Sequence, residues 1–187
     1  MATRRQAREW AVQVLFQLDA SARTATGADE ALDLPLVFGE FWANQLRLRN
    51  ESLPEADRIQ DEELLFAEGW EDRVADGPSR RFCEAIVEGV AEHLPAIDQA
   101  IADAASHWRL DRMGGVERSA LRMGVYEILF CAGDVPAPVA INEAVDVCKY
   151  FGMRDSARFV NGILDHIAKS RGHAAAPADS GETWSPA

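Results

Sequence analysis

Residues 116–167 read VERSALRMGVYEILFCAGDVPAPVAINEAVDVCKYFGMRDSARFVNGILDHI, and this stretch decides the fold. From Val116 to Leu129 little of the segment is polar, which is typical of a helix buried on most of its surface. Gly133, Pro136 and Pro138 follow, and residues of these types end a helix and turn the chain. The stretch therefore begins as a buried helix followed by a sharp reversal.

Two amphipathic helices are predicted after this turn. The first ends at Phe151-Gly152, where the glycine suits a left-handed cap. Asp155 and Ser156 can cap the second helix, and Gly162, inside its apolar stripe, is expected to permit close helix packing. The apolar positions at helical spacing are Ile141, Ala144, Val145 and Cys148 in the first helix, and Val160, Ile163, Leu164 and Ile167 in the second.

The remainder of the chain also favours helices. Residues 4–19 carry an amphipathic stripe, and residues 78–94 and 97–108 carry two more. No strand-like alternation of useful length is present. We therefore predict an all-α protein, with one bundle domain of about seven helices over residues 1–171. The segment 172–187 is rich in Ala, Pro, Ser and Gly and is predicted to be a flexible tail.

Composition places the chain among soluble globular proteins. Its 187 residues are 48% hydrophobic and 27% charged, and no apolar run approaches the roughly 20 residues of a membrane span. The first residues lack the apolar segment of a signal peptide, so a cytoplasmic location is expected. The three cysteines, Cys83, Cys131 and Cys148, are unclustered and lie on apolar faces, which indicates reduced side chains.

The net charge of −12 is unevenly distributed. Residues 29–76 hold 14 acidic and 4 basic side chains, so this segment carries −10 and the rest of the chain only −2. The overall charge therefore does not exclude a local basic site. Within this region, residues 48–76 are predicted to be an acidic insertion at the surface. It carries one short apolar patch, formed by Leu64, Leu65, Phe66 and Trp70.

Catalytic and metal-binding patterns are missing from the sequence. The four histidines form no i,i+4 pair and have no ligand-like carboxylate spacing, so no metal site is predicted. There is no Gly-rich phosphate loop, and Ser119 and Ser156 have no recognisable base. We therefore predict that the protein is not an enzyme and has no cofactor.

Three arginines crowd the first turn of the first helix. Arg4, Arg5 and Arg8 stand where the helix dipole disfavours positive charge, at a cost of a few tenths of a kcal/mol each. Phosphate binding would account for this placement. On residue pattern alone, solvated arginines at a frayed terminus account for it equally well.

A second polar set lies near the last two helices. Lys149, Arg154 and Arg158 can contact phosphates, while Asp155 and Ser156 can hydrogen-bond base edges. The aromatic residue beside them, at position 159, could stack on an unpaired base. The residue pattern alone instead favours peripheral core packing for that ring.

Several of these segments together resemble the NusB family of bacterial transcription antitermination factors. The motif VPxxVAINEAV, followed by KYFG and DSARFVNGILD, resembles the C-terminal half of the family. VERSALRMGVYEI is similar to the preceding helix, and RRQAREWAVQVLFQLD to the basic first helix. The resemblance covers roughly residues 3–46 and 78–170, with the divergent acidic segment between.

The resemblance implies RNA binding and a protein partner. It implies that the protein binds single-stranded boxA RNA of nascent ribosomal RNA, together with the ribosomal protein NusE and other Nus factors of the elongation complex. The implied RNA-binding residues are Arg4, Arg5, Arg8, Lys149, Arg154, Asp155, Ser156, Arg158 and Phe159. Glu117, Arg118 and Arg122 are expected to face outward on a partner surface.

Two alternatives stay open at this point. The same fold resembles the RNA-binding domain attached to some ribosomal RNA cytosine methyltransferases, although no cofactor-binding glycine loop is present. The other alternative is a helical protein–protein scaffold in which the arginines have no RNA-binding role. A titration with boxA-type RNA, with and without NusE, separates these possibilities.

Overall fold

The computed structural model describes residues 3–24, 33–55, 58, 74–105, 109–153 and 155–173. These residues form seven α-helices and one short 3-10 helix, with no strand among them, so the all-α prediction is confirmed. The helices are α1 (Arg4–Thr24), α2 (Leu34–Glu51), α4 (Gly77–Glu92), α5 (Leu94–Ala104), η3 (Leu110–Arg112), α6 (Gly115–Phe130), α7 (Ala137–Phe151) and α8 (Ser156–His173).

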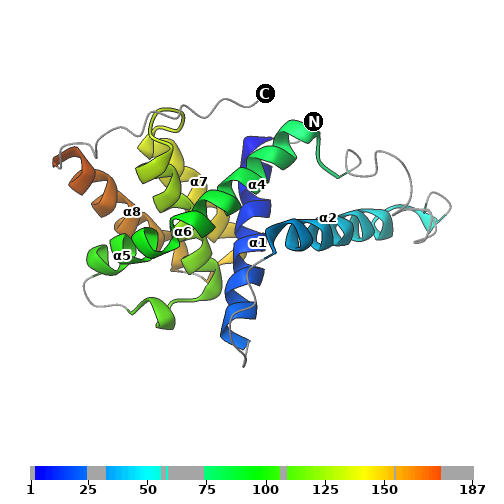
Figure 1. Ribbon diagram of the computed structural model, residues 1–187, viewed down its shortest axis with the longest axis horizontal. Helices are drawn as coiled ribbons and strands as arrows, with labels where there is room; N and C mark the ends of the chain where they lie inside the picture. Colours follow the sequence, from blue (N-terminus) through cyan, green and yellow to red (C-terminus); the bar gives the residue numbers. More distant parts are fainter. Residues whose placement is uncertain are drawn as a thin grey trace.

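Helix α6 is the centre of the bundle. It packs against α1, α4, α5, α7 and α8, and most of its side chains are buried, as its apolar sequence predicts (Figure 1). Gly124 allows a close approach to α8, because a Cβ there would lie 2.7 Å from Leu164 of α8, and it would also lie 3.4 Å from Ala144 of α7. A side chain at this position would therefore displace Leu164 and disturb the packing of α8 on α6.

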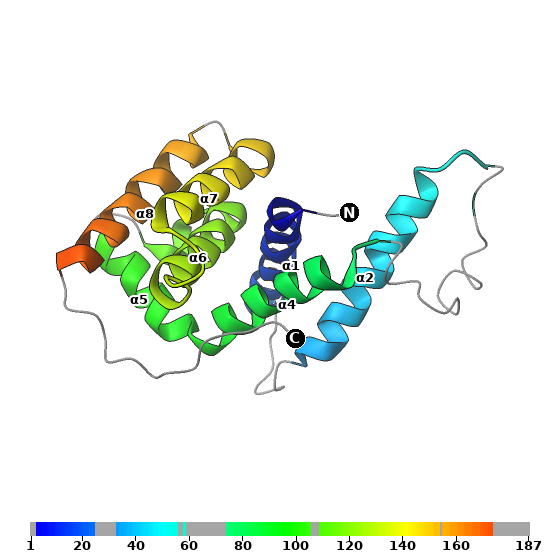
Figure 2. The ribbon, with the colours of Figure 1, turned by 90° about the horizontal axis from the view of Figure 1, so that it is seen from above.

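The other helices are arranged around this centre in two groups. Helices α5, α7 and α8 gather on one side of α6, while α1 and α4 pack together on another (Figures 1 and 2). Helix α2 projects away from the bundle beyond α1. It is anchored by Trp42, which is 1% exposed and meets Trp10 of α1 edge to face at 5.3 Å.

The described ends of segment 48–76 belong to the flanking helices. Residues 48–51 form the last turn of α2, and Asp76 caps α4 by accepting a hydrogen bond from the Ser79 amide at 2.9 Å. Ala75, immediately before this cap, is 2% exposed. The apolar patch expected at residues 64–70 lies outside the described residues, so its place stays a prediction.

Two glycine predictions are wrong. Gly152 ends α7 with φ −91° and ψ 176°, an extended conformation open to any residue, and not with a left-handed cap. A Cβ on Gly162 would meet nothing within 4 Å, so this glycine does not permit close packing. The prediction failed because position 162, at 100° per residue, lies on the side of the helix away from the buried stripe of Val160, Ile163 and Leu164.

The remaining predictions on the fold concern the cysteines, the tail and membrane spans. Cys83 and Cys148 are buried and Cys131 is half-buried, all as free thiols, and burial raises the pKa of Cys148 to about 12. Helix α8 continues to His173, two residues beyond the predicted domain end, and residues 174–187 lie outside the described part. Among the described helices, none is long and apolar enough to cross a membrane.

Candidate nucleic-acid interface

Two of the three N-terminal arginines are at the surface. Arg4 is exposed at the start of α1, and its guanidinium lies 5.4 Å from the centre of the Phe82 ring. The Arg5 side chain is 42% exposed and pairs with Asp146 of α7 at 3.0 Å. Its guanidinium also lies 5.9 Å from the centre of the Tyr150 ring, and Tyr150 is 73% exposed. The start of α1 therefore combines positive charge with an aromatic ring.

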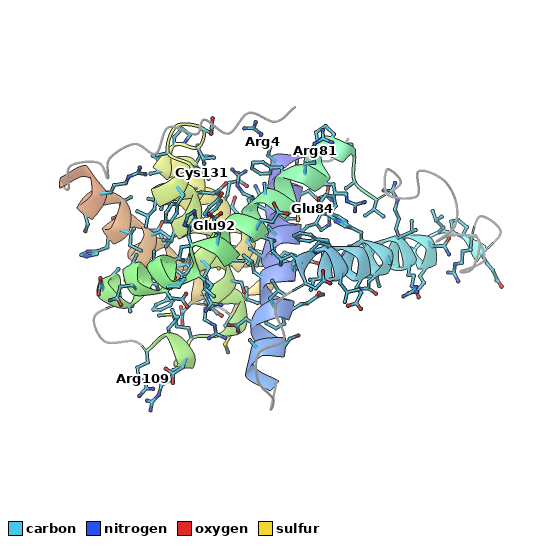
Figure 3. All side chains as sticks on the ribbon, in the orientation of Figure 1. Arg4, Arg81, Glu84, Glu92, Arg109 and Cys131 are labelled. Atoms are coloured by element: carbon cyan, nitrogen blue, oxygen red, sulfur yellow. The ribbon has the colours of Figure 1, made fainter. Side chains whose placement is uncertain are left out.

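Arg81 adds positive charge at the same end of the molecule. It is exposed at the fifth position of α4, a helix whose first turn contains no acidic residue. Figure 3 shows Arg4 and Arg81 near the beginnings of α1 and α4, and Arg109 at the opposite end of the molecule. The sequence analysis did not single out Arg81, although an arginine pair at a helix start was a usable signal.

Arg8 does not belong to this surface, and the expectation that it meets phosphate from the surface is corrected. The residue is 4% exposed, and its Nε donates to both carboxylate oxygens of Glu127 in α6, at 2.9 and 3.1 Å. The Phe82 ring covers the guanidinium at 5.2 Å. The reason is helical spacing, because Arg8 is four residues before Val12 and seven before Leu15, both buried.

Burial and charge oppose each other at Glu127. Burial raises the pKa of this carboxyl group, while the hydrogen bond and the charge of Arg8 lower it. A second carboxylate, Glu143, raises it further, and its Oε2 is buried without a hydrogen-bond partner. Arg8 is therefore the internal cation that keeps the junction of α1 and α6 close to charge balance.

Lys149 links the α1 surface to the C-terminal segment of α7. Its side chain is 59% exposed and donates to Asp146 at 2.7 Å, so Asp146 is shared between Arg5 and Lys149. The hydrogen bond from Lys149 is the first cause of a lowered pKa at Asp146. Beyond α7 the chain continues through Met153, which is 80% exposed. Met153 also lines the groove described next.

A groove of about 1100 Å³ lies where α5, η3, α6 and α8 meet. Asp155 and Arg158 are exposed at its edge, and Phe159 is half-buried, packed against the core and also in the lining. Arg154 lies outside the described residues. The lining consists of Ala104, Ala105, Arg112, Met113, Gly114, Glu117, Met153, Asp155, Ser156, Arg158, Phe159, Gly162 and Ile163.

Ser156 and Glu117 hold the wall of this groove together. Ser156 is 5% exposed and donates its hydroxyl hydrogen bond to the Glu117 carboxylate, which is 8% exposed. Ser156 therefore does not present a free hydroxyl to a base in this conformation, and Glu117 does not face outward as expected. The bond joins the first turns of α6 and α8 and fixes the position from which Asp155 and Phe159 project.

Arg118 is also inside the protein, which corrects its predicted outward orientation. Its side chain is 4% exposed, and its Nε donates to Asp19 of α1 at 2.9 Å. Nη2 donates to the same carboxylate, and Nη1 donates to the carbonyl oxygens of Leu110 and Met113 at 2.9 and 2.8 Å. Arg118 therefore connects α1, η3 and α6, and its donors are used within the protein.

Arg122 extends this internal network. It shares one face of α6 with Arg118, as predicted, because both donate to Asp19. Its other contact is Asp98 of α5, to which Nε and Nη2 donate at 2.8 and 2.9 Å. Burial alone would raise the pKa of Asp19, but the hydrogen bonds and charges of the two arginines outweigh burial and lower it. Any contact of these arginines with a partner stays a prediction.

The structure thus divides the predicted residues into two sets. The exposed or partly exposed set is Arg4, Arg5, Lys149, Asp155, Arg158 and Phe159, and the buried set is Arg8, Glu117, Arg118 and Ser156, with Arg122 largely enclosed. Of the buried set, Glu117 and Ser156 also line the groove. No group of three or more His, Cys, Asp or Glu side chains that could hold a metal ion is present among the described residues. The arrangement offers cations, an aromatic ring and hydrogen-bonding groups, the combination that binds unpaired nucleic acid.

The helix order and the central α6 define the class: this is a NusB-type helical bundle. A solved T. maritima NusB structure superimposes with a TM-score of 0.64 at 28% identity, covering 94% of both chains. A solved structure of NusB and NusE with dsRNA has a TM-score of 0.57, covering 89% of this chain and 96% of that one. At 24% identity it shows the fold alone.

The sequence comparisons identify the family. The NusB family model matches residues 43–169, and the chain belongs to the NusB family. A relative named transcription antitermination protein NusB, from Syntrophotalea carbinolica, is 38% identical over 167 residues, which covers 89% of this chain and 92% of the relative. One from Pelotomaculum thermopropionicum is 37% identical over 168 residues, covering 90% of each. The resemblance seen in the sequence motifs is therefore confirmed.

Proposed function

We propose that this protein binds single-stranded boxA-type RNA of nascent ribosomal RNA together with NusE, and so promotes antitermination of ribosomal RNA transcription. The observation that carries this proposal is the connection of two surfaces, one at the start of α1 and the groove beside α8. Tyr150 lies against Arg5 and Lys149 shares Asp146 with it, while Met153, three residues after Tyr150, lines the groove. The solved complex of NusB and NusE with dsRNA supports both an RNA and a NusE partner for a protein of this fold.

The two surfaces suit different parts of a single strand. Arg4, Arg5 and Arg81 offer charge to phosphates, and a cation of this kind contributes to affinity whatever the sequence. Phe159 and Asp155 at the groove offer stacking and a hydrogen-bond acceptor to an unpaired base. Each set is small, so the RNA alone binds weakly. A NusE partner that contacts both protein and RNA raises the affinity through effective concentration.

The direct test is a fluorescence-anisotropy titration of the protein with a labelled single-stranded boxA RNA, with and without NusE. Expected results are saturable binding that strengthens when NusE is added and weakens with a scrambled strand of equal length. Binding to NusE without any RNA binding, alone or in the complex, would instead establish the protein–protein scaffold.

Replacing Arg4 and Arg5 together with Ala is expected to reduce RNA affinity and to flatten its salt dependence. Each lost phosphate contact should change the slope of log K against log salt by about 0.7 on single-stranded RNA. Titrations at four salt concentrations measure the slope. The matched control is Arg47→Ala, which removes an exposed positive charge from α2, the helix that projects away from the bundle, and should leave the slope unchanged. Equal slopes for wild type and the double variant would show that Arg4 and Arg5 do not contact phosphates.

Replacing Phe159 with Ala is expected to cost ~1–3 kcal/mol of RNA affinity through lost stacking. The ring is only half-buried, so the stability loss should stay below the ~3–5 kcal/mol of a fully buried phenylalanine. Thermal unfolding and RNA titration on the same sample measure both quantities. A large stability loss with unchanged affinity of the folded protein would assign Phe159 to the core.

A further inference from the structure

Gly162 has no structural reason to be a glycine. It lies in the interior of α8, where glycine destabilises a helix relative to alanine, and it is exposed. A Cβ at this position would meet no atom within 4 Å. Gly89 and Gly124 in the bundle differ from Gly162. A Cβ on Gly89 would come within 2.1 Å of Tyr126, and one on Gly124 within 2.7 Å of Leu164. Those two glycines are required by packing, and Gly162 is not.

The position of Gly162 in the groove suggests why a glycine is needed there. Gly162 is a lining residue and follows Arg158 by four positions and Phe159 by three, so all three lie on one side of α8. Side chains on a helix tilt towards its N-terminus and cover the preceding turn. A side chain at position 162 would therefore extend over the turn that carries Arg158 and Phe159. Its absence leaves that part of the groove open.

We infer that Gly162 is an RNA-contact position that allows an unpaired nucleotide to lie against the α8 backbone beside Phe159. The inference rests on the RNA binding proposed above. Two exposed arginines line the same groove, Arg112 from η3 and Arg158 from α8, so its rim can hold phosphate next to the stacked base. An apolar peptide would leave these two charges unpaired. A nucleotide would pair its phosphate with them and place its base on the surface left open at Gly162.

The test combines stability and binding for Gly162→Ala and Gly162→Leu. Both variants should melt above wild type, by about 2–4 °C for Ala, because a helix-breaking residue is removed and nothing clashes. RNA affinity should fall with side-chain size, slightly for Ala and about tenfold for Leu. The matched controls are Gly39→Ala and Gly39→Leu, since Gly39 is also exposed inside a helix with nothing within 4 Å of its Cβ. These should change stability and leave RNA affinity unchanged.

The results distinguish failure of this inference from failure of the proposed function. If wild type binds boxA RNA and Gly162→Leu binds it equally well, the inference fails and the proposed function stands. If wild type binds no RNA, both fail. A lowered melting temperature for Gly162→Ala would assign the glycine to packing. A Leu variant that loses NusE binding but keeps RNA binding would assign the groove to the protein partner.

Discussion

Replacing Arg8 with Ala will destabilise the protein by about 3–5 kcal/mol, the cost of removing one partner from a buried ion pair. The guanidinium and the Glu127 carboxylate are only 5% and 1% exposed and are bonded at 2.8 to 3.1 Å. Removing Arg8 leaves the carboxylate charged inside the protein, beside the second carboxylate of Glu143. Urea unfolding followed by circular dichroism at pH 7 measures the loss.

The same variant should depend on pH in a defined direction. Burial already raises the pKa of Glu127, and without Arg8 nothing comparable lowers it, so the folded-state pKa rises further above the unfolded value. The folded state then binds more protons than the unfolded state between these two pKa values, and stability falls as pH rises through that window. The loss caused by Arg8→Ala should therefore be smaller at pH 5 than at pH 7. An equal loss at both values would show that Glu127 does not carry it.

A double variant provides the control for the buried pair. Arg8→Met with Glu127→Leu removes both charges and keeps apolar volume, and such exchanges are often neutral or stabilising. We expect this protein to recover most of the stability and to bind RNA with the salt slope of wild type. A reduced slope in this stable double variant would instead return Arg8 to the phosphate-binding surface.

The sequence predicted the helices because their signals are local. The apolar spacing in residues 116–167 and the residues that start α4, Asp76 and Pro78, can be recognised without knowing the rest of the fold. The exposed positions of Asp155 and Arg158 also followed from local spacing, since they lie off the stripe of Val160 and Ile163. Local periodicity therefore gave the architecture and the groove-facing side of α8.

The buried charges could not be found in the same way. Arg8 and Glu127 are 119 positions apart, Arg118 and Asp19 are 99 apart, and an isolated charged side chain is expected at the surface from its residue type alone. Only the packing of α1 on α6 brings each pair together. The residues that bind a ligand and the residues that hold helices together thus have similar sequence signatures.

Replacing Asp19 with Asn will destabilise the protein by about 3 kcal/mol, near the lower end of the range for a broken buried pair. Asp19 accepts hydrogen bonds from Arg118 and from Arg122, and its side chain is 11% exposed. The neutral amide keeps the shape but removes the negative charge between two guanidinium groups. Part of the interaction survives, because Arg118 keeps its two carbonyl acceptors and Arg122 keeps Asp98.

The matched control is Asp98→Asn, which affects only Arg122. The Asp98 side chain is 27% exposed, so this change should cost about 1 kcal/mol or less.

The pH dependence of Asp19→Asn should be opposite to that of Arg8→Ala. The two arginines outweigh burial and lower the pKa of Asp19, so its contribution is complete above the unfolded pKa of about 3.9 and is lost only as pH falls through the lower folded value. The stability difference between wild type and Asp19→Asn should be the same at pH 7 and pH 5 and shrink below about pH 4. A difference that already fades between pH 7 and pH 5 would mean that another titrating group, and not Asp19, holds Arg118 and Arg122 in place.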